Sequence, residues 1–348
     1  MHEIRLRVKL AAAGVTIGGC VSEVQARHFE ERLKRDAPGS GVAVLIPCYN
    51  EELTVGGVVR QFRAALPGAE IYVFDNNSSD RTAEEARNAG AGVFFERRQG
   101  KGYVVQSMFR KIKADIYVIV DGDGTYPADA VAQLIEPVRR QEADMVIGSR
   151  LANSANSEFR WLNRLGNRFF LVLLQFIFGV RLTDLLSGYR CFSRRLVRGL
   201  PLFGGGFETE AEMTIKALQR GFTIIEAPVS LGARPKGSRS KIRLVQDGFV
   251  ILNCMLVLLR DYKPLTFFGG AGATLLIAGA VPAVLAGIQF SQTGSLPVLM
   301  VLTAATLLGA GSAALTVGLV LHSITRRFQE LDHQIQTLAD DIRSDEAR

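Results

Sequence analysis

The chain has 348 residues, of which 48% are hydrophobic and 22% are charged, and its formal net charge is +7. These values are typical of a folded globular protein and exclude a disordered chain, a collagen and a disulfide scaffold. The length predicts a core domain of about 200 residues together with further segments. The four cysteines show no close pairing in the sequence, and we assign them no chemistry.

The first 40 residues are predicted to be an extension and linker before the core domain. Three basic residues precede a modest apolar stretch at residues 10–21, which faintly resembles a secretory signal. Three glycines and a threonine interrupt this stretch, so we favour a peripheral extension. Residues 22–35 have the pattern of a short amphipathic helix, and residues 37–41 (APGSG) read as a linker.

Residues 41–233 alternate between short apolar runs and helical patterns. Continuous runs rich in β-branched residues, separated by helices, predict βαβ units and a mostly parallel, Rossmann-like sheet. Such α/β sheets bind their ligands at the carboxyl ends of the strands. The predicted strands are residues 42–47, 70–75, 92–96, 115–121 and 144–149.

Polar and acidic residues follow three of these strands, in the segments CYNEE (48–52), DNNSSD (75–80) and DGDGTYP (121–127). Such residues also cap helices and form turns, and this alternative stays open for Asp80. Asp121 and Asp123 are different, because two carboxylates lie two residues apart at a strand end with glycines between and after them. A site with so few carboxylates is typical of Mg²⁺ or Mn²⁺ bound together with a diphosphate.

Basic residues are concentrated in two segments. Residues 150–198 contain nine arginines against two acidic residues, and residues 234–263 contain seven basic residues against two acidic ones. Because these charges lack interleaved aromatic residues and lie next to an apolar segment, we expect a lipid phosphate and anionic headgroups as partners, and no nucleic acid. Residues 164–180 are predicted to be either an interfacial helix or a buried core helix, and residues 242–259 an interfacial helix.

No charged side chain occurs from Pro264 to Thr325. The two apolar runs in this segment, about 265–290 and 296–322, are each long enough to cross a bilayer. We therefore predict a transmembrane α-helical hairpin over residues 264–322, following a basic loop and juxtamembrane helix over residues 234–263. Two buried helices of a soluble protein would normally show a polar stripe, which neither run has.

Basic residues flank this hairpin at both ends, with Arg260 and Lys263 before it and Arg326 and Arg327 after it, whereas the connecting turn is uncharged. The positive-inside rule then places both ends of the hairpin in the cytoplasm. The chain is accordingly predicted to be a multi-pass protein of the cytoplasmic (inner) membrane, with two spans, whose main domain faces the cytosol.

The remaining residues, 323–348, form a predicted cytoplasmic tail with a heptad pattern. Its apolar residues recur at intervals of four and three, which is typical of the seam of a coiled coil. The seam is shorter than three heptads and marginal alone, so we expect it to pack between protomers of a homo-oligomer or on the main domain. The seam residues are Ile324, Phe328, Leu331, Ile335, Leu338 and Ile342.

Six motifs in order make the chain recognisable: IPCYNEE, DNNSSDRT, RRQGKG, DGDGTYP, GSR and TDLLSGYR. Together they resemble the inverting family 2 glycosyltransferases with a GT-A fold, and within them the polyprenyl-phosphate glycosyltransferases. The resemblance covers about residues 42–241, and the predicted hairpin extends it to the bacterial members of that group. It implies a GT-A catalytic domain over residues 41–233.

The resemblance also implies residue roles. Asp121, Asp123 and Arg150 are the implied catalytic residues, and Asp121 and Asp123 would hold the metal, with Asp123 the likelier direct ligand. The implied acceptor-phosphate residues are Arg150, Arg160 and Arg164. The implied nucleotide-sugar residues are Pro47, Tyr49, Glu51, Asp75, Asn77, Lys101, Asp121, Gly122, Asp184, Arg234, Ser238 and Lys241.

Three motif details are left open. The turn Gly100-Lys101-Gly102 is either a place where backbone N–H groups face the nucleotide or a plain strand-to-helix turn. Glu208 and Glu210 are either sugar contacts or structural. The chain departs from the group at residues 157–167 (SEFRWLNRLGN), where no serine lies four residues after Arg160 or Arg164, and where Ser157 argues against a processive enzyme.

The implied activity is the inverting transfer of one sugar from a nucleotide-sugar to polyprenyl phosphate at the cytoplasmic membrane face. A UDP-sugar is favoured over GDP-mannose as the donor. One alternative is a family 2 transferase that acts on a lipid or glycan hydroxyl. The other, a non-catalytic membrane adaptor, is disfavoured because Asp121 and Asp123 are both present.

Overall fold

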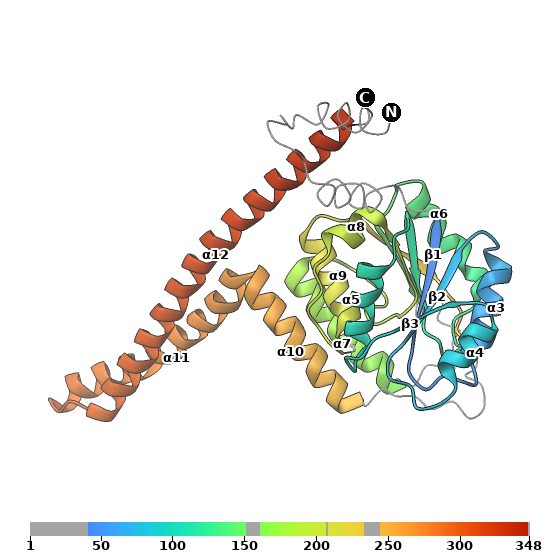
Figure 1. Cartoon of the computed structure of the whole chain (residues 1–348). Helices are drawn as coiled ribbons and strands as arrows, with labels where there is room; N and C mark the ends of the chain where they lie inside the picture. The colour runs from blue at the N-terminus through green and yellow to red at the C-terminus, as the bar shows by residue number, and fades with distance from the viewer. Residues whose placement is uncertain (1–40, 151–160, 207, 233–243, 347–348) are drawn as a thin grey trace. The chain divides into compact units, whose positions relative to one another are not determined.

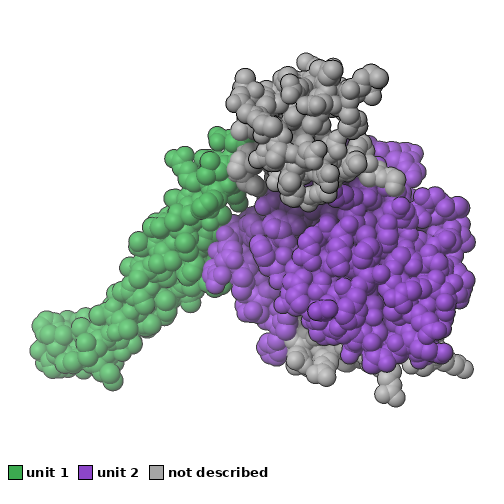
Figure 2. All heavy atoms as spheres, viewed as in Figure 1, with its two compact units in different colours: residues 1–38, 264–348 green, residues 39–263 purple. Residues whose placement is uncertain are grey.

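The computed structural model describes residues 41–150, 161–206, 208–232 and 244–346, and the chain divides into two compact units (Figure 2). The larger unit runs from residue 39 to residue 263, and the other contains the C-terminal residues from Pro264 onward. The break between the units falls at the start of the charge-free segment. The extension predicted over residues 1–40 lies outside the described residues, and the finer division of residues 41–263 stays a prediction.

The larger unit is built on a seven-stranded sheet in the order β3-β2-β1-β4-β6-β5-β7 (Figure 1). β6 is antiparallel to both β4 and β5, and the other neighbours pair in parallel. The mostly parallel sheet expected from the sequence is therefore confirmed. The strands are β1 (Val42–Cys48), β2 (Glu70–Asp75), β3 (Gly92–Phe95), β4 (Ile116–Ile119), β5 (Met145–Ser149), β6 (Arg190–Ser193) and β7 (Ile224–Pro228).

Helices cover both faces of the sheet. Successive side chains of each central strand point to opposite faces, so each strand contributes to two hydrophobic clusters. In β1, Val44 and Ile46 belong to one hydrophobic cluster, and Ala43 and Leu45 belong to another. The first cluster is closed by α3 (Val55–Ala65), α4 (Thr82–Asn88) and α6 (Val131–Arg139), which follows the short 3-10 helix η1 (Ala128–Ala130). The second is closed by α5 (Lys101–Lys111), α8 (Arg194–Gly199) and α9 (Thr209–Gln219).

Two further helices, α7 (Trp161–Phe178) and α10 (Leu244–Tyr262), pack with α9 around a third cluster that includes Phe170, Leu174, Ile215 and Met255. The same two helices leave other large apolar side chains exposed. Each helix therefore combines a buried face with an exposed apolar face, so α7 has features of both alternatives left open by the sequence. The exposed apolar side chains are Phe169, Val172, Phe176, Phe249, Val250 and Leu256.

The C-terminal unit contains two long helices, α11 (Pro264–Thr293) and α12 (Val298–Glu346), which pack against each other as an antiparallel hairpin. Glycines permit the close approach, since a Cβ at Gly272 would lie 2.9 Å from the carbonyl oxygen of Gly311, and the reverse holds for Gly311. By length and composition both helices can cross a membrane. In the most apolar 18-residue stretch of each helix, only 17% and 11% of the residues are buried. α12 continues beyond its apolar part without a break.

Candidate active site

The polar segments that follow β1, β2 and β4 meet at the carboxyl edge of the sheet. Asn76, just after β2, donates its backbone N–H to the carbonyl of Cys48, the last residue of β1, at 2.9 Å. Thr54, after β1, donates its hydroxyl to the carbonyl of Gly122, after β4, at 2.7 Å. The edge predicted to carry the ligand site is therefore assembled from three strand ends, as parallel topology requires.

The DGDG turn after β4 holds two carboxylates against this edge. A Cβ at Gly122 would lie 2.5 Å from the Sγ of Cys48, so only glycine lets the turn pack on β1. Asp123 is 9% exposed, and its Oδ1 accepts the backbone N–H of Thr125 at 3.1 Å and the Thr125 hydroxyl at 2.7 Å. The close packing of Gly122 thus fixes the turn, and these hydrogen bonds fix the carboxylate of Asp123.

Lys101, the first residue of α5, joins this turn to α9. Its Nζ lies 2.6 Å from Asp121 Oδ1 and 2.6 Å from Glu210 Oε1. Burial alone would lower the pKa of Lys101, but the two carboxylates outweigh that effect and raise it. The ammonium therefore stays charged between one carboxylate of the DGDG turn and one at the start of α9.

The backbone N–H groups on either side of Lys101 donate to other parts of the protein. The N–H of Gly100 donates to Asn76 Oδ1 at 2.8 Å, and the N–H of Gly102 donates to the carbonyl of Gly205 at 3.1 Å. These two N–H groups are satisfied within the protein, which favours the plain strand-to-helix turn of the two alternatives, and contact of the turn with a nucleotide stays a prediction. Asn76 also donates to the carbonyls of Glu96 and Arg98, at 3.1 and 2.8 Å, and so anchors the whole loop before α5.

Several residues implied to bind the nucleotide-sugar lie together near the ends of β1 and β2. Pro47 is in β1, in register with Phe74 of β2, and Tyr49 follows with a side chain that is 40% exposed. Asp75 ends β2 and accepts the backbone N–H of Ser78 at 3.1 Å.

The turns after these two strands interlock. Glu51 donates its backbone N–H to the hydroxyl of Thr82 at 2.8 Å. Asn77 adopts a left-handed conformation, with φ 62°, and donates its side-chain amide to the carbonyl of Arg97 at 2.7 Å. These implied nucleotide-sugar residues therefore share one edge of the sheet, and their contact with a nucleotide stays a prediction.

Arg150, directly after β5, forms a two-pronged ion pair with Asp184. Its Nε lies 2.6 Å from Asp184 Oδ2, and its Nη2 donates to Oδ1 at 2.8 Å. Asp184 is fully buried, and Glu226 of β7 accepts the backbone N–H groups of Thr183 and Asp184, both at 2.9 Å, through Oε1. The guanidinium plane is thus set by a carboxylate that is itself held in place.

The two parts of the site are adjacent. Gly188 donates its backbone N–H to the hydroxyl of Tyr126 at 3.1 Å, and a side chain at Gly188 would collide with the carboxylate of Asp121. Burial raises the pKa of Tyr126, and the charges of Arg150, Asp121 and Asp184 all act on its hydroxyl. The pair Arg150–Asp184 therefore lies within electrostatic range of the DGDG turn.

Some predicted residues are not placed, and some observed ones were not predicted. Arg160, Arg234, Ser238 and Lys241 lie outside the described residues, and Arg164 lies in α7 at a position whose side chain is not described. The sequence did not reveal the roles of Asn76 and Glu226. The sequence alone indicated only a sugar contact or a structural residue at Glu210. Its position between Glu208 and Glu212 could have indicated that a buried cation, here Lys101, lies nearby.

Asp121 and Asp123 fit a metal ion whose remaining ligands come from the substrate and water. In the part of the chain that the structure describes, no group of three or more His, Cys, Asp or Glu side chains could hold a metal. Asp121 and Asp123 alone would supply protein ligands, as is usual for Mg²⁺ completed by substrate phosphates and water. Because Asp121 already pairs with Lys101, Asp123 is the better direct ligand. The residues fit Mg²⁺ or Mn²⁺ together with a diphosphate.

Comparison with known proteins agrees with this geometry. The sequence profile of Glycosyl transferase family 2 matches residues 43–200. Glycosyltransferase AglJ of Haloferax volcanii is 34% identical over 232 residues, which cover 66% of this chain and 76% of that protein. A dolichyl-phosphate hexose transferase of the same organism is 31% identical over 188 residues, which cover 54% of this chain and 81% of that protein.

Solved structures show the fold. Glucosyl-3-phosphoglycerate synthase from Mycobacterium tuberculosis, crystallised with Mn²⁺, UDP and glucosyl-3-phosphoglycerate, superposes with a TM-score of 0.54 at 23% identity. The match covers 70% of this chain and 85% of that one. The fold and the sequence matches together lead to one assignment. The chain belongs to glycosyltransferase family 2, and its larger unit has the GT-A fold.

Proposed function

We propose that this protein transfers a single sugar, with inversion, from a nucleotide-sugar to a polyprenyl phosphate at the cytoplasmic face of a membrane. The observation that carries the proposal is the arginine held in a fixed plane by a buried carboxylate, next to the acidic DGDG turn. The acidic turn suits a metal-bound donor, and the arginine suits an anionic acceptor.

The donor half of the site rests on Asp121, Asp123 and Lys101. A divalent metal, when bound, would neutralise negative charge on the departing diphosphate. Lys101 adds a cation beside the same turn and keeps Asp121 in one position. The M. tuberculosis neighbours were crystallised with UDP, which favours a UDP-sugar over GDP-mannose as the donor.

The acceptor half rests on charge and on the absence of a histidine base. A hydroxyl acceptor needs a group that takes its proton, whereas a phosphate monoester is already anionic near neutral pH and needs cations to align it. The four histidines of the chain are residues 2, 28, 322 and 333, all outside the GT-A unit. Asp121 is paired with Lys101, and Asp184 with Arg150. Histidine and these two carboxylates are thus not available as the base for a hydroxyl acceptor, and the cation at Arg150 suits a phosphate acceptor.

The apolar surfaces support a lipid acceptor. α11 and α12 are long and apolar enough to span a bilayer, and α7 and α10 expose large apolar side chains. The relative named dolichyl-phosphate hexose transferase points to the same acceptor class. We place residues 41–233 as the catalytic domain, residues 234–263 at the membrane surface and residues 264–322 within the membrane, with both ends cytoplasmic because basic residues flank the hairpin.

The test is an assay of purified full-length protein with undecaprenyl phosphate, Mg²⁺ or Mn²⁺ and a panel of UDP-, GDP- and dTDP-sugars. We expect one lipid-linked sugar, lost in EDTA and in Asp123→Ala. Unphosphorylated polyprenol is the matched control and should accept nothing. Transfer to polyprenol, or no product from any donor with undecaprenyl phosphate, would contradict the acceptor assignment. Full activity in EDTA would contradict the metal assignment.

A substitution at Gly188 tests the contact between the two halves of the site. We expect Gly188→Ala to lower kcat strongly, because the added methyl group occupies the space of the Asp121 carboxylate. The backbone at Gly188 does not need a positive φ, so the methyl group itself is the cause. Gly57→Ala is the matched control, since nothing lies within 4 Å of a Cβ there. Equal activity of the two variants would refute the close packing of Gly188 on Asp121.

A further inference from the structure

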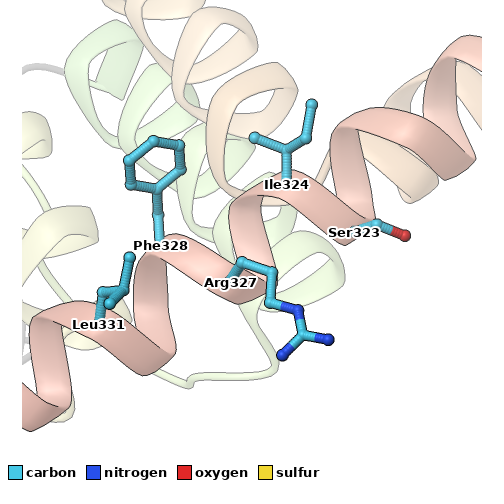
Figure 3. Close-up of a pocket in the computed structure, with 5 residues that line it drawn as sticks. All are labelled: Ser323, Ile324, Arg327, Phe328 and Leu331. Carbon is cyan, nitrogen blue, oxygen red and sulfur yellow. The ribbon is translucent and has the colours of Figure 1, made fainter.

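The C-terminal part of α12, beyond its most apolar segment, carries a row of exposed apolar side chains. Ile324, Phe328 and Leu331 are 46%, 67% and 52% exposed, and they project from the same side of the helix, whereas Arg327 projects from another (Figure 3). Together with Ser323 and Arg327 they line a hollow of about 290 Å³. Large apolar side chains in a row beyond a charged turn mark a surface that a partner covers.

The sequence continues this row. The same spacing of four and three residues runs on through Ile335, Leu338 and Ile342, and α12 stays helical as far as Glu346. A strict apolar repeat of 3.5 residues keeps one seam of a helix facing a second helix along its whole length. A helix that packs alone on a flat surface does not need this strict repeat. The repeat therefore points to another helix with the same period as the occupant.

We propose that residues 324–342 of α12 form a parallel two-stranded coiled coil with the same segment of a second copy of this chain. In this register the a positions are Phe328, Ile335 and Ile342, and the d positions are Ile324, Leu331 and Leu338. From Leu331 onward the seam has leucine at d and isoleucine at a, the combination that favours two parallel strands.

Charge supports the same pairing. Arg327 occupies position g and Asp332 occupies the following e position, so the parallel pairing brings Arg327 of each copy beside Asp332 of the other. Within its own helix Arg327 lies 3.3 Å from Glu330, in an exposed ion pair that is worth little and is easily exchanged. An antiparallel pairing would not bring these two positions together.

The apolar seam is short, so its association depends on the membrane anchor. Fewer than three heptads are marginal for two helices that meet in free solution. If the α11–α12 hairpins of two copies lie in one bilayer, they share one orientation and a high effective concentration, and both favour parallel association. The inference uses the membrane placement of the hairpin but does not depend on which sugar or acceptor the enzyme uses.

Disulfide trapping of the full-length protein in bilayer vesicles tests the register. We expect Phe328→Cys and Leu331→Cys each to form an intermolecular disulfide on mild oxidation, because equivalent seam positions face each other only in a parallel pair. His333→Cys, at the outward f position, is the matched control, and the unsubstituted chain gives the background from its native cysteines. Seam variants that cross-link no more than His333→Cys would overturn the proposal.

A second measurement asks whether the seam holds the copies together. The detergent-extracted protein is expected to have the mass of a dimer, and Leu331→Lys is expected to halve that mass, whereas Gln329→Lys at the exposed b position leaves it unchanged. Both variants should retain transfer activity, which shows that they fold and separates this result from a failure of the proposed function. A monomeric parent protein, or a dimer that survives Leu331→Lys, would contradict the proposal.

Discussion

Replacing Lys101 by methionine is expected to lower kcat/KM for sugar transfer on the order of 10²-fold or more, since preorganised charges of this kind dominate catalysis. Methionine keeps much of the length of the side chain but removes the ammonium that lies 2.6 Å from both Asp121 and Glu210. Without that cation the two carboxylates repel each other. Asp121 would no longer be held where the metal and the diphosphate need it.

The effect on folding is separable from the effect on catalysis. Breaking a buried ion pair costs about 3–5 kcal/mol when the remaining charge is fully enclosed. The side chain of Asp121 is 29% exposed and can turn toward water, but that of Glu210 is only 6% exposed and would be left buried without the Lys101 ammonium, so we expect a clear loss of stability. Thermal unfolding of Lys101→Met should therefore show a folded protein with a lowered Tm, and binding of UDP with Mn²⁺ should be weakened in that folded protein.

Two variants control this result. Lys111→Met removes an exposed lysine from the other end of α5 and should leave kcat/KM unchanged. Glu210→Gln keeps the ammonium and its bond to Asp121, so its loss of activity should be smaller than that of Lys101→Met. Near-normal transfer by a folded Lys101→Met would show that the carboxylates need no cation between them.

The sheet was largely predictable because its central strands are buried on both faces. Such strands appear in the sequence as continuous apolar runs, and β1, predicted over residues 42–47, was found at Val42–Cys48. β6 and β7 were missed. β6 has only four residues, and it begins with Arg190, a residue type that argues against a buried strand. The structure resolves the conflict, since Arg190 donates to the carbonyls of Ser187 and Leu185 and to the hydroxyl of Thr214.

The candidate active site was predictable only where its residues follow strands directly. Asp121 and Asp123 could be placed at a strand end from the sequence, because every parallel strand delivers its last residue to the same edge. The partner of Asp121 could not, since Lys101 and Glu210 start two different helices, and their meeting depends on how both helices pack on one face of the sheet. Ion pairs between residues of different helices and turns depend on tertiary packing, so a local sequence pattern does not predict them.

Arg150→Lys is expected to raise the KM for polyprenyl phosphate roughly 10- to 100-fold, the equivalent of about 1.5–3 kcal/mol for one charge-assisted hydrogen bond. Arg150 uses Nε and Nη2 together on Asp184, and this pair fixes the plane of the guanidinium. A lysine keeps the positive charge but cannot reproduce the two-pronged geometry. The KM for the nucleotide-sugar should change less than the acceptor KM, because Asp184, which is also an implied nucleotide-sugar residue, is unchanged in this variant.

Asp184→Asn is a second substitution that should weaken binding of the acceptor phosphate. The amide offers only one acceptor oxygen to the guanidinium, so Arg150 keeps its charge but loses its orientation. We expect the acceptor KM to rise by a smaller factor than in Arg150→Lys. Arg140→Lys is the matched control, because Arg140 also pairs with a carboxylate, Glu136 at 2.8 Å, but on the exposed end of α6 where such a pair is worth little. A donor KM that rises as much as the acceptor KM would move Arg150 from the acceptor side of the reaction to the donor side.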